Sequence, residues 1–428
     1  MGKRRYRRIL ILVFYTFFIL HTFSSQHLIR LKSFLLNLPQ KEYMAFNMIP
    51  VVDVDIRERE LEAVKEVVKS RYLVEGNNAR EFEKKFSDFT GSKYATTVVN
   101  GTAALHLALT ALDIGPKDEV ITTPFTFIAS SNSILFNGGV PIFVDVNPET
   151  YNIDPEKIED KITEKTKAIM PIHIFGNPCD MKAIKDIAED HNLYIIEDCA
   201  QAHDARIEGQ HVGTFGDVGC FSFYGTKNLV GGEGGAIITN NEELFEKIRS
   251  IKNHGRSPKG GYHHYYVGFN YRMTDMSAAI MNIQMDRADE ILSKRHHNGD
   301  LYRKLLAEFD SLQIQKILPS HQHSDYIFAP IIKEPDIQPK EVIEYLKSHE
   351  IGSRTIYSVL SYQQPCYKNI ELWHMSKVVS YPDYSKMKCE NAEYLATHHF
   401  ELPMVTSLTE ENIYYIVETL NKFFSSKK

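Results

Sequence analysis

Short β-branched runs alternate with helix-length segments between residues 94 and 239, and no other feature of the chain constrains its fold as strongly. Runs of this length are typical of buried strands, and the segments between them are long enough for helices. The alternation predicts a mostly parallel sheet with helices on both faces, which is an α/β fold. The expected strands are Tyr94–Val99, Glu119–Thr122, Ile142–Asp145, Ala168–Ile172, Leu193–Glu197, Gly219–Phe223 and Ala236–Thr239, and the expected helices are Thr102–Leu112, Ala129–Asn137, Pro155–Ile162 and Met181–His191.

Two amphipathic segments precede this region, and a different pattern follows it. Helical periodicity places Leu61, Val64 and Val68 on one face of 56–70, and Phe82, Phe86 and Phe89 on one face of 78–90. After about residue 300 we expect a helix at Gly299–Phe309, a strand at Tyr326–Ile332, and helices at Pro339–His349 and Glu410–Phe424. The expected organisation is a large domain over 48–298 and a smaller C-terminal α/β domain over 299–428.

Residues 1–47 differ from the rest of the chain in charge and hydropathy. They carry a net charge of +7, which leaves −13 for the remaining residues of a chain whose total is −6. Their apolar run (ILILVFYTFFIL) is shorter than the roughly 20 residues that cross a bilayer, and no A-x-A-like cleavage site follows. Globular patterning begins near Met48. We therefore interpret this extension as a start-site artefact, with translation beginning at Met44 or Met48, and a membrane anchor is the alternative.

Composition excludes several classes of protein. Hydrophobic residues make up 43% of the chain and charged residues 24%, which is the balance of a globular protein and not of a disordered or fibrous one. A net charge of −6 argues against a nucleic-acid binder, which neutralises phosphates with positive charge. The five cysteines form no CxxC pair, which disfavours a zinc site or disulfide framework and favours a cytoplasmic location. Cys199 and Cys220 lie in apolar surroundings, so we expect them to pack as small hydrophobes.

Ligands bind beyond the carboxyl ends of the strands in an open parallel sheet, so polar residues there are the first candidates for function. Asp198 directly follows the strand Leu193–Glu197. A carboxylate at the end of a buried strand is costly unless a positive group meets it. The alternative is an ordinary helix cap with no ligand.

Lys227 is the single lysine in the stretch Gly219–Gly235 (GCFSFYGTKNLVGGEGG). We expect Phe221, Phe223 and Tyr224 to desolvate its amine partly and so expose a nucleophile. The alternative is an exposed surface lysine. The glycines that follow match neither G-x-x-x-x-G-K-[ST] nor G-x-G-x-x-G, which disfavours a P-loop or Rossmann nucleotide site.

A third candidate lies at Asn100–Ala104 (NGTAA), between a strand and an Ala/Leu-rich helix. Glycine permits a tight turn there, and the exposed N–H groups of the first helical turn form an anion site. An ordinary cap is again the alternative. Together the three candidates supply what pyridoxal phosphate needs, because this cofactor requires a lysine for its Schiff base, an acid at its pyridinium nitrogen and a cradle for its phosphate.

Four motifs resemble those of the DegT/DnrJ/EryC1/StrS family of PLP-dependent sugar aminotransferases. They are Asn100–Leu105 (NGTAAL), Glu197–His203 (EDCAQAH), Cys220–Gly235 and Gly268–Met273 (GFNYRM). The similarity extends from about Met48 to Leu420 and keeps the order and approximate spacing of the family's motifs. It implies the fold-type I aminotransferase architecture, pyridoxal 5′-phosphate as cofactor, and a homodimer with its active sites at the subunit interface.

The resemblance also implies a role for each candidate residue. Lys227 is the Schiff-base lysine, and Asp198 is the partner of the pyridine nitrogen. Five further residues have roles by the same resemblance: Gln201 approaches the ring hydroxyl, Thr102 and Ala103 hold the phosphate with Ser222, and Phe127, in TTPFTFIAS, stacks on the ring. From the neighbouring subunit, Asn270 reaches the phosphate, and Arg272 meets an anionic group of the substrate.

One stretch departs from the family. Near Tyr357 the family often has a tyrosine–proline pair followed by a histidine, whereas here Ser358 replaces the proline and Tyr362 stands about where the histidine would be. We therefore treat Tyr362 as the substrate-binding candidate at this position. The departure concerns contacts with the sugar and not the chemistry of the cofactor.

The implied reaction moves an amino group from an amino acid, by family analogy L-glutamate, to a keto-sugar nucleotide in amino-sugar and surface-polysaccharide biosynthesis. The stretch SRTIYSVLSYQQPCY is similar to perosamine-synthase-like members, which favours a 4-keto-6-deoxy sugar. A sugar dehydratase of the same fold is an alternative, although such members can carry histidine at the position of Lys227. A non-catalytic, membrane-tethered sensor is another, supported only by the N-terminal apolar run.

His263 and His264 stand side by side in an aromatic stretch (GGYHHYYVGFN). Adjacent residues on an extended segment point to opposite sides, so we expect no metal site there. Tyrosine is favoured at protein interfaces, so this stretch is expected at the dimer surface.

Overall fold

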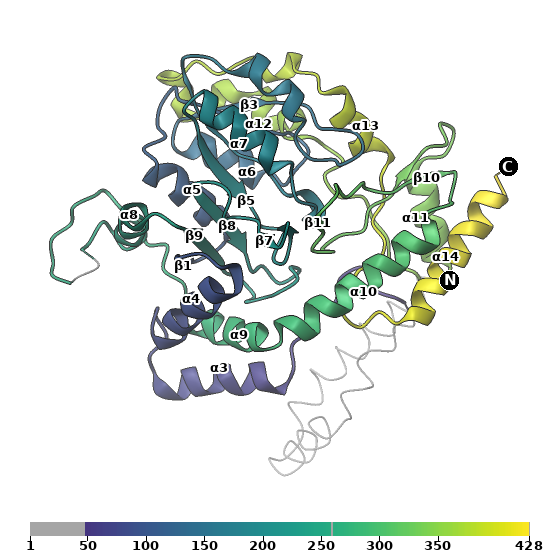
Figure 1. Ribbon diagram of the computed structural model, residues 1–428, viewed down its shortest axis with the longest axis horizontal. Helices are drawn as coiled ribbons and strands as arrows, with labels where there is room; N and C mark the ends of the chain where they lie inside the picture. The colour runs from purple at the N-terminus through teal and green to yellow at the C-terminus, as the bar shows by residue number, and fades with distance from the viewer. Residues whose placement is uncertain (1–47, 258–259, 428) are drawn as a thin grey trace, which may run out of the picture. The chain divides into compact units, whose positions relative to one another are not determined.

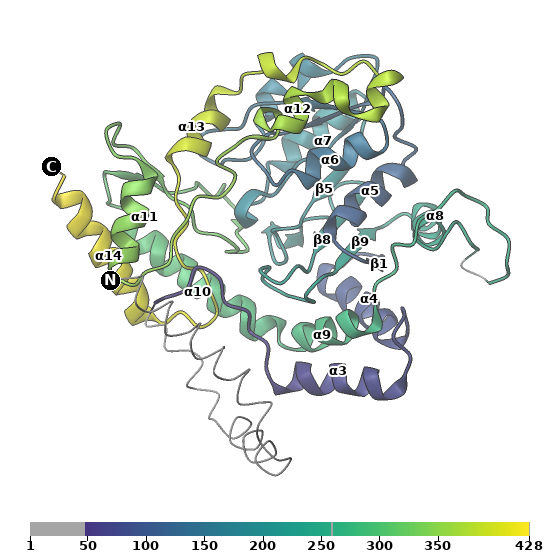
Figure 2. The same ribbon diagram turned by 180° about the vertical axis from the view of Figure 1, so that it is seen from behind.

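A computed structural model describes residues 48–257 and 260–427, and Ile49–Lys428 forms one compact unit (Figures 1 and 2). The two interpretations of 1–47, a start-site artefact and a membrane anchor, concern residues outside those described. Within the described ranges, none of the helices is long and apolar enough to cross a bilayer.

A seven-stranded sheet in the order β1-β9-β8-β5-β4-β2-β3 lies at the centre of this unit. β8, β5, β4, β2 and β3 pair in parallel, whereas β9 runs antiparallel to both β1 and β8. The predicted mostly parallel sheet is therefore confirmed, with one reversed strand. The strands are β1 (Tyr94–Val98), β2 (Glu119–Thr122), β3 (Val140–Phe143), β4 (Thr166–Ile169), β5 (Tyr194–Asp198), β8 (Val218–Ser222) and β9 (Gly235–Thr239).

Helices cover both faces of the sheet because side chains alternate along each strand. Ile196 and Cys220 pack against α5 and α8, whereas their neighbours Ile195 and Phe221 point to the opposite face, towards α7 and α4 with α9. Cys199 and Cys220 are buried in these clusters, as the sequence predicts. The helices named so far and below are α3 (Glu58–Ser70), α4 (Asn77–Thr90), α5 (Gly101–Ala111), α6 (Ala129–Phe136), α7 (Met181–Asp190), α8 (Glu242–Lys252), α9 (Asp275–Asp286), α10 (Ala288–Leu306), α11 (Pro339–Ser348), α12 (Pro365–Lys368), α13 (Glu390–His398) and α14 (Glu410–Ser425).

Helix α3 does not bury its apolar stripe. Leu61 and Val68 are exposed, whereas Glu60 and Val67 are buried. The Glu60 carboxylate accepts hydrogen bonds from Arg287 Nη1 at 2.6 Å and Gln284 Nε2 at 2.8 Å. A buried carboxylate needs such partners, so this polar network fixes the rotation of α3 against α9.

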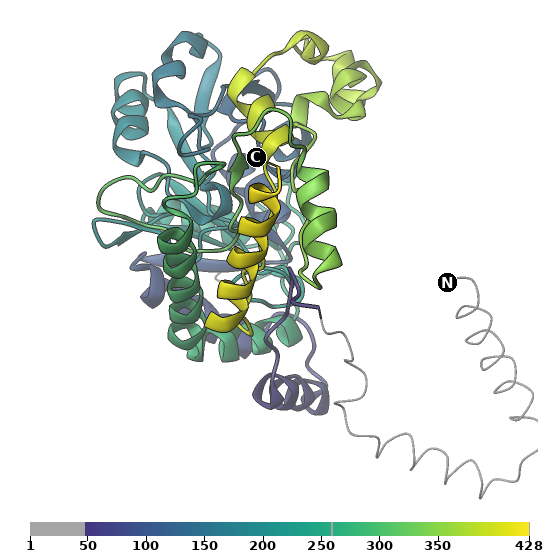
Figure 3. The same ribbon diagram turned by 90° about the vertical axis from the view of Figure 1, so that its right-hand side faces the viewer.

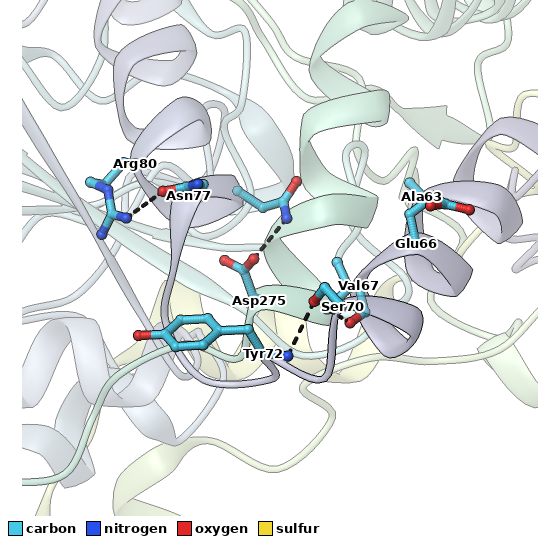
Figure 4. Close-up of a pocket in the computed structure, with 9 residues that line it drawn as sticks. Ala63, Glu66, Val67, Ser70, Tyr72, Asn77, Arg80 and Asp275 are labelled. Carbon is cyan, nitrogen blue, oxygen red and sulfur yellow. Dashed lines mark hydrogen bonds between the residues drawn. The ribbon is translucent and has the colours of Figure 1, made fainter.

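A pocket of about 550 Å³ opens where α3, α4 and α9 meet (Figure 4). Asp275 lies at its edge, and its Oδ1 accepts hydrogen bonds from the N–H groups of Gly76 at 2.9 Å and Ala79 at 3.2 Å. A carboxylate at the start of a helix satisfies donors that lack an intrahelical partner. Asp275 therefore ties the start of α4 to the start of α9.

The C-terminal part of the chain packs α10, α11 and α14 side by side around a core of its own (Figure 3). The expected helix Gly299–Phe309 is the second half of α10, which runs through the expected boundary at residue 298. The division into a large and a small domain therefore stays a prediction. Only the end of the expected strand Tyr326–Ile332 forms a strand, β12 (Ile331–Ile332). The expected helix Pro155–Ile162 consists instead of two 3₁₀ turns.

The segment that follows α8 projects from the body of the molecule (Figure 1). Tyr262, Tyr265 and Val267 are exposed in it, Val267 to 94%. Apolar and aromatic side chains exposed in this way are typical of a surface that binds another protein.

Candidate active site

Asp198 ends strand β5, and its carboxylate is buried. Oδ2 accepts a hydrogen bond from Ser130 Oγ on α6 at 2.7 Å, and Oδ1 accepts one from the N–H of Ala200 at 3.1 Å. Burial raises the pKa of Asp198, and the two hydrogen bonds and the charge of Lys227 offset part of that rise. β5 pairs in parallel with β8, so Asp198 and the loop after β8 that carries Lys227 lie at the same edge of the sheet.

Lys227 lies in the loop between β8 and β9. Its backbone N–H donates to the carbonyl of Tyr224 at 2.9 Å, and its Nζ lies 4.5 Å from the centroid of the Tyr326 ring. The prediction that Phe221 and Phe223 surround this amine is wrong. Both rings lie on the face of the sheet that α4 and α9 cover. They pack edge-on against Phe86 of α4, at centroid distances of 4.9 Å for Phe221 and 5.3 Å for Phe223.

The turn before α5 lies against the end of β8. Asn100 caps the helix by accepting a hydrogen bond from the N–H of Ala103 at 2.9 Å. A Cβ added to Gly101 would lie 2.7 Å from Cβ of Ser222, so glycine is needed for this approach. The contact brings Thr102 and Ala103, at the start of α5, next to the Ser222 hydroxyl, which is the arrangement that a phosphate cradle requires.

Gln201 is held on both sides. Its Oε1 accepts a hydrogen bond from the N–H of Phe175 at 2.8 Å, and its Nε2 donates to the hydroxyl oxygen of Tyr357 at 3.1 Å. The Tyr357 ring stacks on that of Phe175, with centroids 6.2 Å apart and planes 8° apart. Tyr357 and Phe175 both adopt positive φ angles, 58° and 60°, and burial raises the pKa of Tyr357. Strained backbone of this kind clusters at functional sites.

Phe127 is 58% exposed and lines a pocket of about 240 Å³ together with Tyr357. An exposed aromatic ring beside an open pocket offers a stacking surface for a planar ligand. The other lining residues are Thr126, Ile128, Ser358, Val359, Ser361 and Gln364.

Tyr362 does not line this pocket. It is buried beside Phe143, its hydroxyl donates to Glu393 Oε1 at 2.7 Å, and it accepts the N–H of Cys389 at 3.1 Å. The expectation that Tyr362 contacts substrate is therefore corrected, because the hydroxyl is committed to α13 and to the residue before it. Ser361 and Gln364, its neighbours in the chain, face the pocket instead.

Asn270 and Arg272 lie at the base of the projecting segment. Asn270 is exposed, its backbone pairs with Asn253, and Arg272 Nη1 donates to Asn253 Oδ1 at 2.6 Å. Within the described part of one chain, these contacts do not bring either residue to Lys227. Their expected role depends on a second subunit.

The structure adds residues that motif reasoning missed. Ser130 binds Asp198 and stands one helical turn beyond Phe127, in the same TTPFTFIAS stretch, so its spacing was a usable signal. Tyr326 lies far from every motif in the sequence, so no sequence signal identified it.

His173, Glu197 and Cys199 bring possible metal ligands together in the core. His173 Nδ1 accepts the N–H of Cys179 at 3.0 Å, and its Nε2 lies 3.2 Å from Glu197 Oε2. The Glu197 carboxylate also accepts three backbone N–H bonds, from residues 213, 215 and 216, at 2.7 to 2.8 Å. Because these atoms are already hydrogen-bonded, the cluster is structural and holds the end of β5 beside Asp198.

Comparison with known proteins agrees with this geometry. A model described as the DegT/DnrJ/EryC1/StrS aminotransferase family matches residues 54–421. The chain belongs to this family. It is 37% identical over 387 residues to a GDP-perosamine synthase of Escherichia coli O157:H7, covering 89% of this chain and 99% of that protein. It is 35% identical over 380 residues to a UDP-N-acetyl-3-dehydro-alpha-D-glucosamine 3-aminotransferase of Acidithiobacillus ferrooxidans, covering 87% and 97%.

Solved structures place the chain in the same group. An aminotransferase from Psychrobacter cryohalolentis superposes with a TM-score of 0.80 at 31% identity, covering 88% of this chain and 99% of that one. A sugar aminotransferase described as putative, Spr1654 of Streptococcus pneumoniae in its PLP form, gives a TM-score of 0.78 at 26% identity, covering 88% and 98%. The protein is an aminotransferase of amino-sugar biosynthesis with the fold-type I architecture, and its cofactor is pyridoxal phosphate.

The residues at the site fit this cofactor. Asp198 offers a buried carboxylate, Lys227 an amine, and the close contact of Gly101 with Ser222 a cradle at the start of α5. An acid, an amine and an anion site are the three groups that the cofactor needs from a protein.

Proposed function

We propose that Lys227 binds pyridoxal phosphate covalently and that Asp198 pairs with its ring nitrogen. The observation that supports this most strongly is that Asp198 ends β5 and Lys227 follows β8, the strand that pairs in parallel with β5. A single planar cofactor ring could therefore bind to both Asp198 and Lys227. Removal of either group is expected to abolish turnover.

Each residue of the site has a task in this proposal. The bound cofactor supplies an electron sink for the carbon from which a proton leaves. Lys227 Nζ, released when the amino donor enters, takes that proton and later returns it as general base and acid. Asp198 stays ionised and holds a proton on the ring nitrogen, while Ser130 orients the carboxylate.

The remaining contacts bind and orient. Thr102 and Ser222 hold the phosphate, Phe127 covers one face of the ring, and Gln201, itself fixed by Tyr357, approaches the ring hydroxyl. The N–H of Ala103 caps the helix through Asn100 and so supports the cradle without binding the phosphate itself. A second copy of the chain completes the site with Asn270 and Arg272, the latter at an anionic group of the substrate. The exposed segment that carries Tyr265 and Val267 supports a homodimer.

We propose L-glutamate as amino donor and a nucleotide-linked 4-keto-6-deoxy sugar as acceptor, in surface-polysaccharide assembly in the cytoplasm. The similarity to a GDP-perosamine synthase supports this acceptor. The similarity to a 3-aminotransferase supports a 3-keto sugar as the second candidate. A dehydratase is disfavoured, because Lys227 keeps the amine that transamination uses.

The test is incubation of the purified protein with cofactor, L-glutamate and a panel of 3-keto and 4-keto sugar nucleotides, with mass detection of the products. We expect one 4-keto substrate to gain an amine while glutamate becomes a keto acid. Amination of a 3-keto sugar alone would select the second candidate. Loss of water without gain of nitrogen would overturn the aminotransferase assignment in favour of the dehydratase.

A further inference from the structure

Ser324 and Tyr326, far along the chain from every sequence motif, contact the loops that carry the proposed cofactor residues. Ser324 Oγ donates to the carbonyl of Gln201 at 2.9 Å, and the Ser324 carbonyl accepts a hydrogen bond from Asn228 Nδ2 at 2.6 Å. Asn228 directly follows Lys227 in the chain. The segment therefore touches both the loop that carries Gln201 and the loop that carries Lys227.

Tyr326, two residues after Ser324, contacts the Lys227 amine itself. Its ring faces Lys227, with Nζ 4.5 Å from the ring centroid, and its hydroxyl lies 3.3 Å from Thr226 Oγ1. Tyr326 is buried, whereas Lys227 is only half-buried, so the ring is the fixed partner and the lysine the flexible one. The face of an aromatic ring attracts an ammonium group, more strongly as both lose water.

A buried group of charges fixes the backbone that carries the ring. The Asp325 carboxylate is bound by Arg303 Nη1 at 2.7 Å and by His296 Nδ1 at 3.1 Å, both from α10, and His323 Nδ1 lies 3.3 Å away. Asp325 has a φ angle of 49°. Residues other than glycine seldom adopt this backbone conformation, and here the surrounding contacts hold it in place.

The same group of charges is joined to the opposite side of the site. His296 Nε2 lies 3.1 Å from Asp204 Oδ2, three residues beyond Gln201, and Arg295 donates from Nη1 to the carbonyls of Asp325 and Tyr326 at 3.3 and 3.4 Å. The turn at Asp325 is thus held from its side chain and from its backbone. Because these contacts fix the backbone at Asp325, the Tyr326 ring has little freedom to move away from the Lys227 amine.

We propose that Tyr326 is a positioning residue for Lys227, holding the amine on the face of its ring when the amine carries a proton and is not bonded to the cofactor. This role rests on the proposed function of Lys227. It gives the lysine a defined place to return to between half-reactions, when the flexible side chain would otherwise sample several rotamers.

The test measures Lys227 in protein freed of cofactor. Reductive methylation with ¹³C-formaldehyde places methyl groups on the lysine amines. The NMR signal of Lys227, assigned by its loss in Lys227→Arg, reports whether the amine lies over an aromatic ring, because the face of a ring shifts such signals upfield. Tyr326→Leu removes the ring, and Tyr326→Phe keeps the ring but removes the hydroxyl. We expect an upfield Lys227 signal in the wild type and in the Phe variant, and a signal at the position of exposed lysines in the Leu variant.

Two results would overturn the proposal: the same Lys227 signal position in all three proteins, or loss of the upfield shift in both variants, which would assign the position of the amine to the hydroxyl bond with Thr226. Unchanged circular dichroism of each variant verifies that it is folded. The labelling needs no cofactor, so its outcome is independent of whether Lys227 binds pyridoxal phosphate. That second question is answered separately, by testing whether borohydride attaches the cofactor to Lys227 in the wild type.

Discussion

Ser130 controls the charge of the acid that the cofactor needs. Its hydroxyl bond lowers the pKa of Asp198, against the rise caused by burial. Ser130→Ala removes that bond, so the pKa of Asp198 rises further and the carboxylate loses its charge at higher pH. A hydrogen bond to a charged group contributes about 1.5–3 kcal/mol, so we expect the acid limb of kcat/KM to move up by about one to two pH units.

A neighbouring serine provides the control for this prediction. Ser131 is also buried on α6, but its hydroxyl bonds to the carbonyl of Ile128. Ser131→Ala should leave the acid limb where the wild type has it. An equal shift in both variants would mean that the helix, and not the bond to Asp198, sets the profile.

In the proposed mechanism, Lys227→Ala removes both the group that attaches the cofactor and the base that moves the proton. We expect a folded protein that binds pyridoxal phosphate without a covalent bond and loses turnover by about 10⁴-fold. Turnover with glutamate and a keto-sugar nucleotide is the measurement. Lys247→Ala, on α8 and paired with Asp113, is the matched control and should retain wild-type turnover.

At the scale of elements, the approach of α5 to β8 forms the proposed phosphate cradle. Gly101→Ala would place a Cβ 2.7 Å from Cβ of Ser222, which forces the start of the helix away from the hydroxyl. We expect the dissociation constant of pyridoxal phosphate to rise by about tenfold, the equivalent of losing one good hydrogen bond. Gly115→Ala, whose added Cβ would meet nothing closer than 4.0 Å, should bind as the wild type does. Equal affinity in all three proteins would contradict the cradle.

The link between α10 and the site loops makes stability depend on pH. Asp204 and Asp325 raise the pKa of His296 to about 9, and the pKa values of both carboxyls are themselves lowered, so both stay charged near neutrality. A raised folded pKa stabilises the protein fully below the unfolded value, about 6.5, and this contribution is lost as pH rises through 9.

His296→Gln removes this contribution. Between pH 6.5 and 10, we expect the free energy of unfolding of the wild type to fall by about 3 kcal/mol more than that of the variant. Urea denaturation at a series of pH values measures both. Parallel pH profiles would show that His296 is not charged in the folded protein.

At the scale of the whole molecule, a site shared between two subunits can be reconstituted from two inactive variants. In the proposed homodimer, Asn270→Asp would repel the phosphate of the partner's site, while Lys227→Ala inactivates its own. Mixing the two under conditions that exchange subunits should restore part of the activity, because one site in each mixed dimer carries neither change. No recovery, with mixed dimers detected by mass spectrometry, would contradict sharing of the site.

The order of elements was predictable because hydrophobic period and strand-end chemistry are local. The runs ending at Val99 and Glu197 gave strands β1 and β5 within a residue or so at their ends, and Asp198 and Lys227 came from the same reading. The rotation of α3 was not predictable, because Glu60 is buried only where Arg287, distant in the sequence, reaches it.

The residues that line the site were also not predictable from the local sequence. Tyr362 and Tyr357 lie five residues apart in one stretch, yet the first is buried against α13 and the second faces the pocket. Nothing in the local pattern separates them. Tyr326 reaches Lys227 through contacts with α10 that no spacing rule encodes.

The most direct test of this account is reduction of the cofactor-loaded protein with borohydride, followed by proteolysis and mass spectrometry of the peptides. We predict that the mass of the reduced pyridoxal phosphate adduct appears on the peptide that contains Lys227, and that Asp198→Asn leaves this attachment possible while turnover is lost. Attachment to another lysine, or none in a protein that turns over substrate, would contradict the assignment.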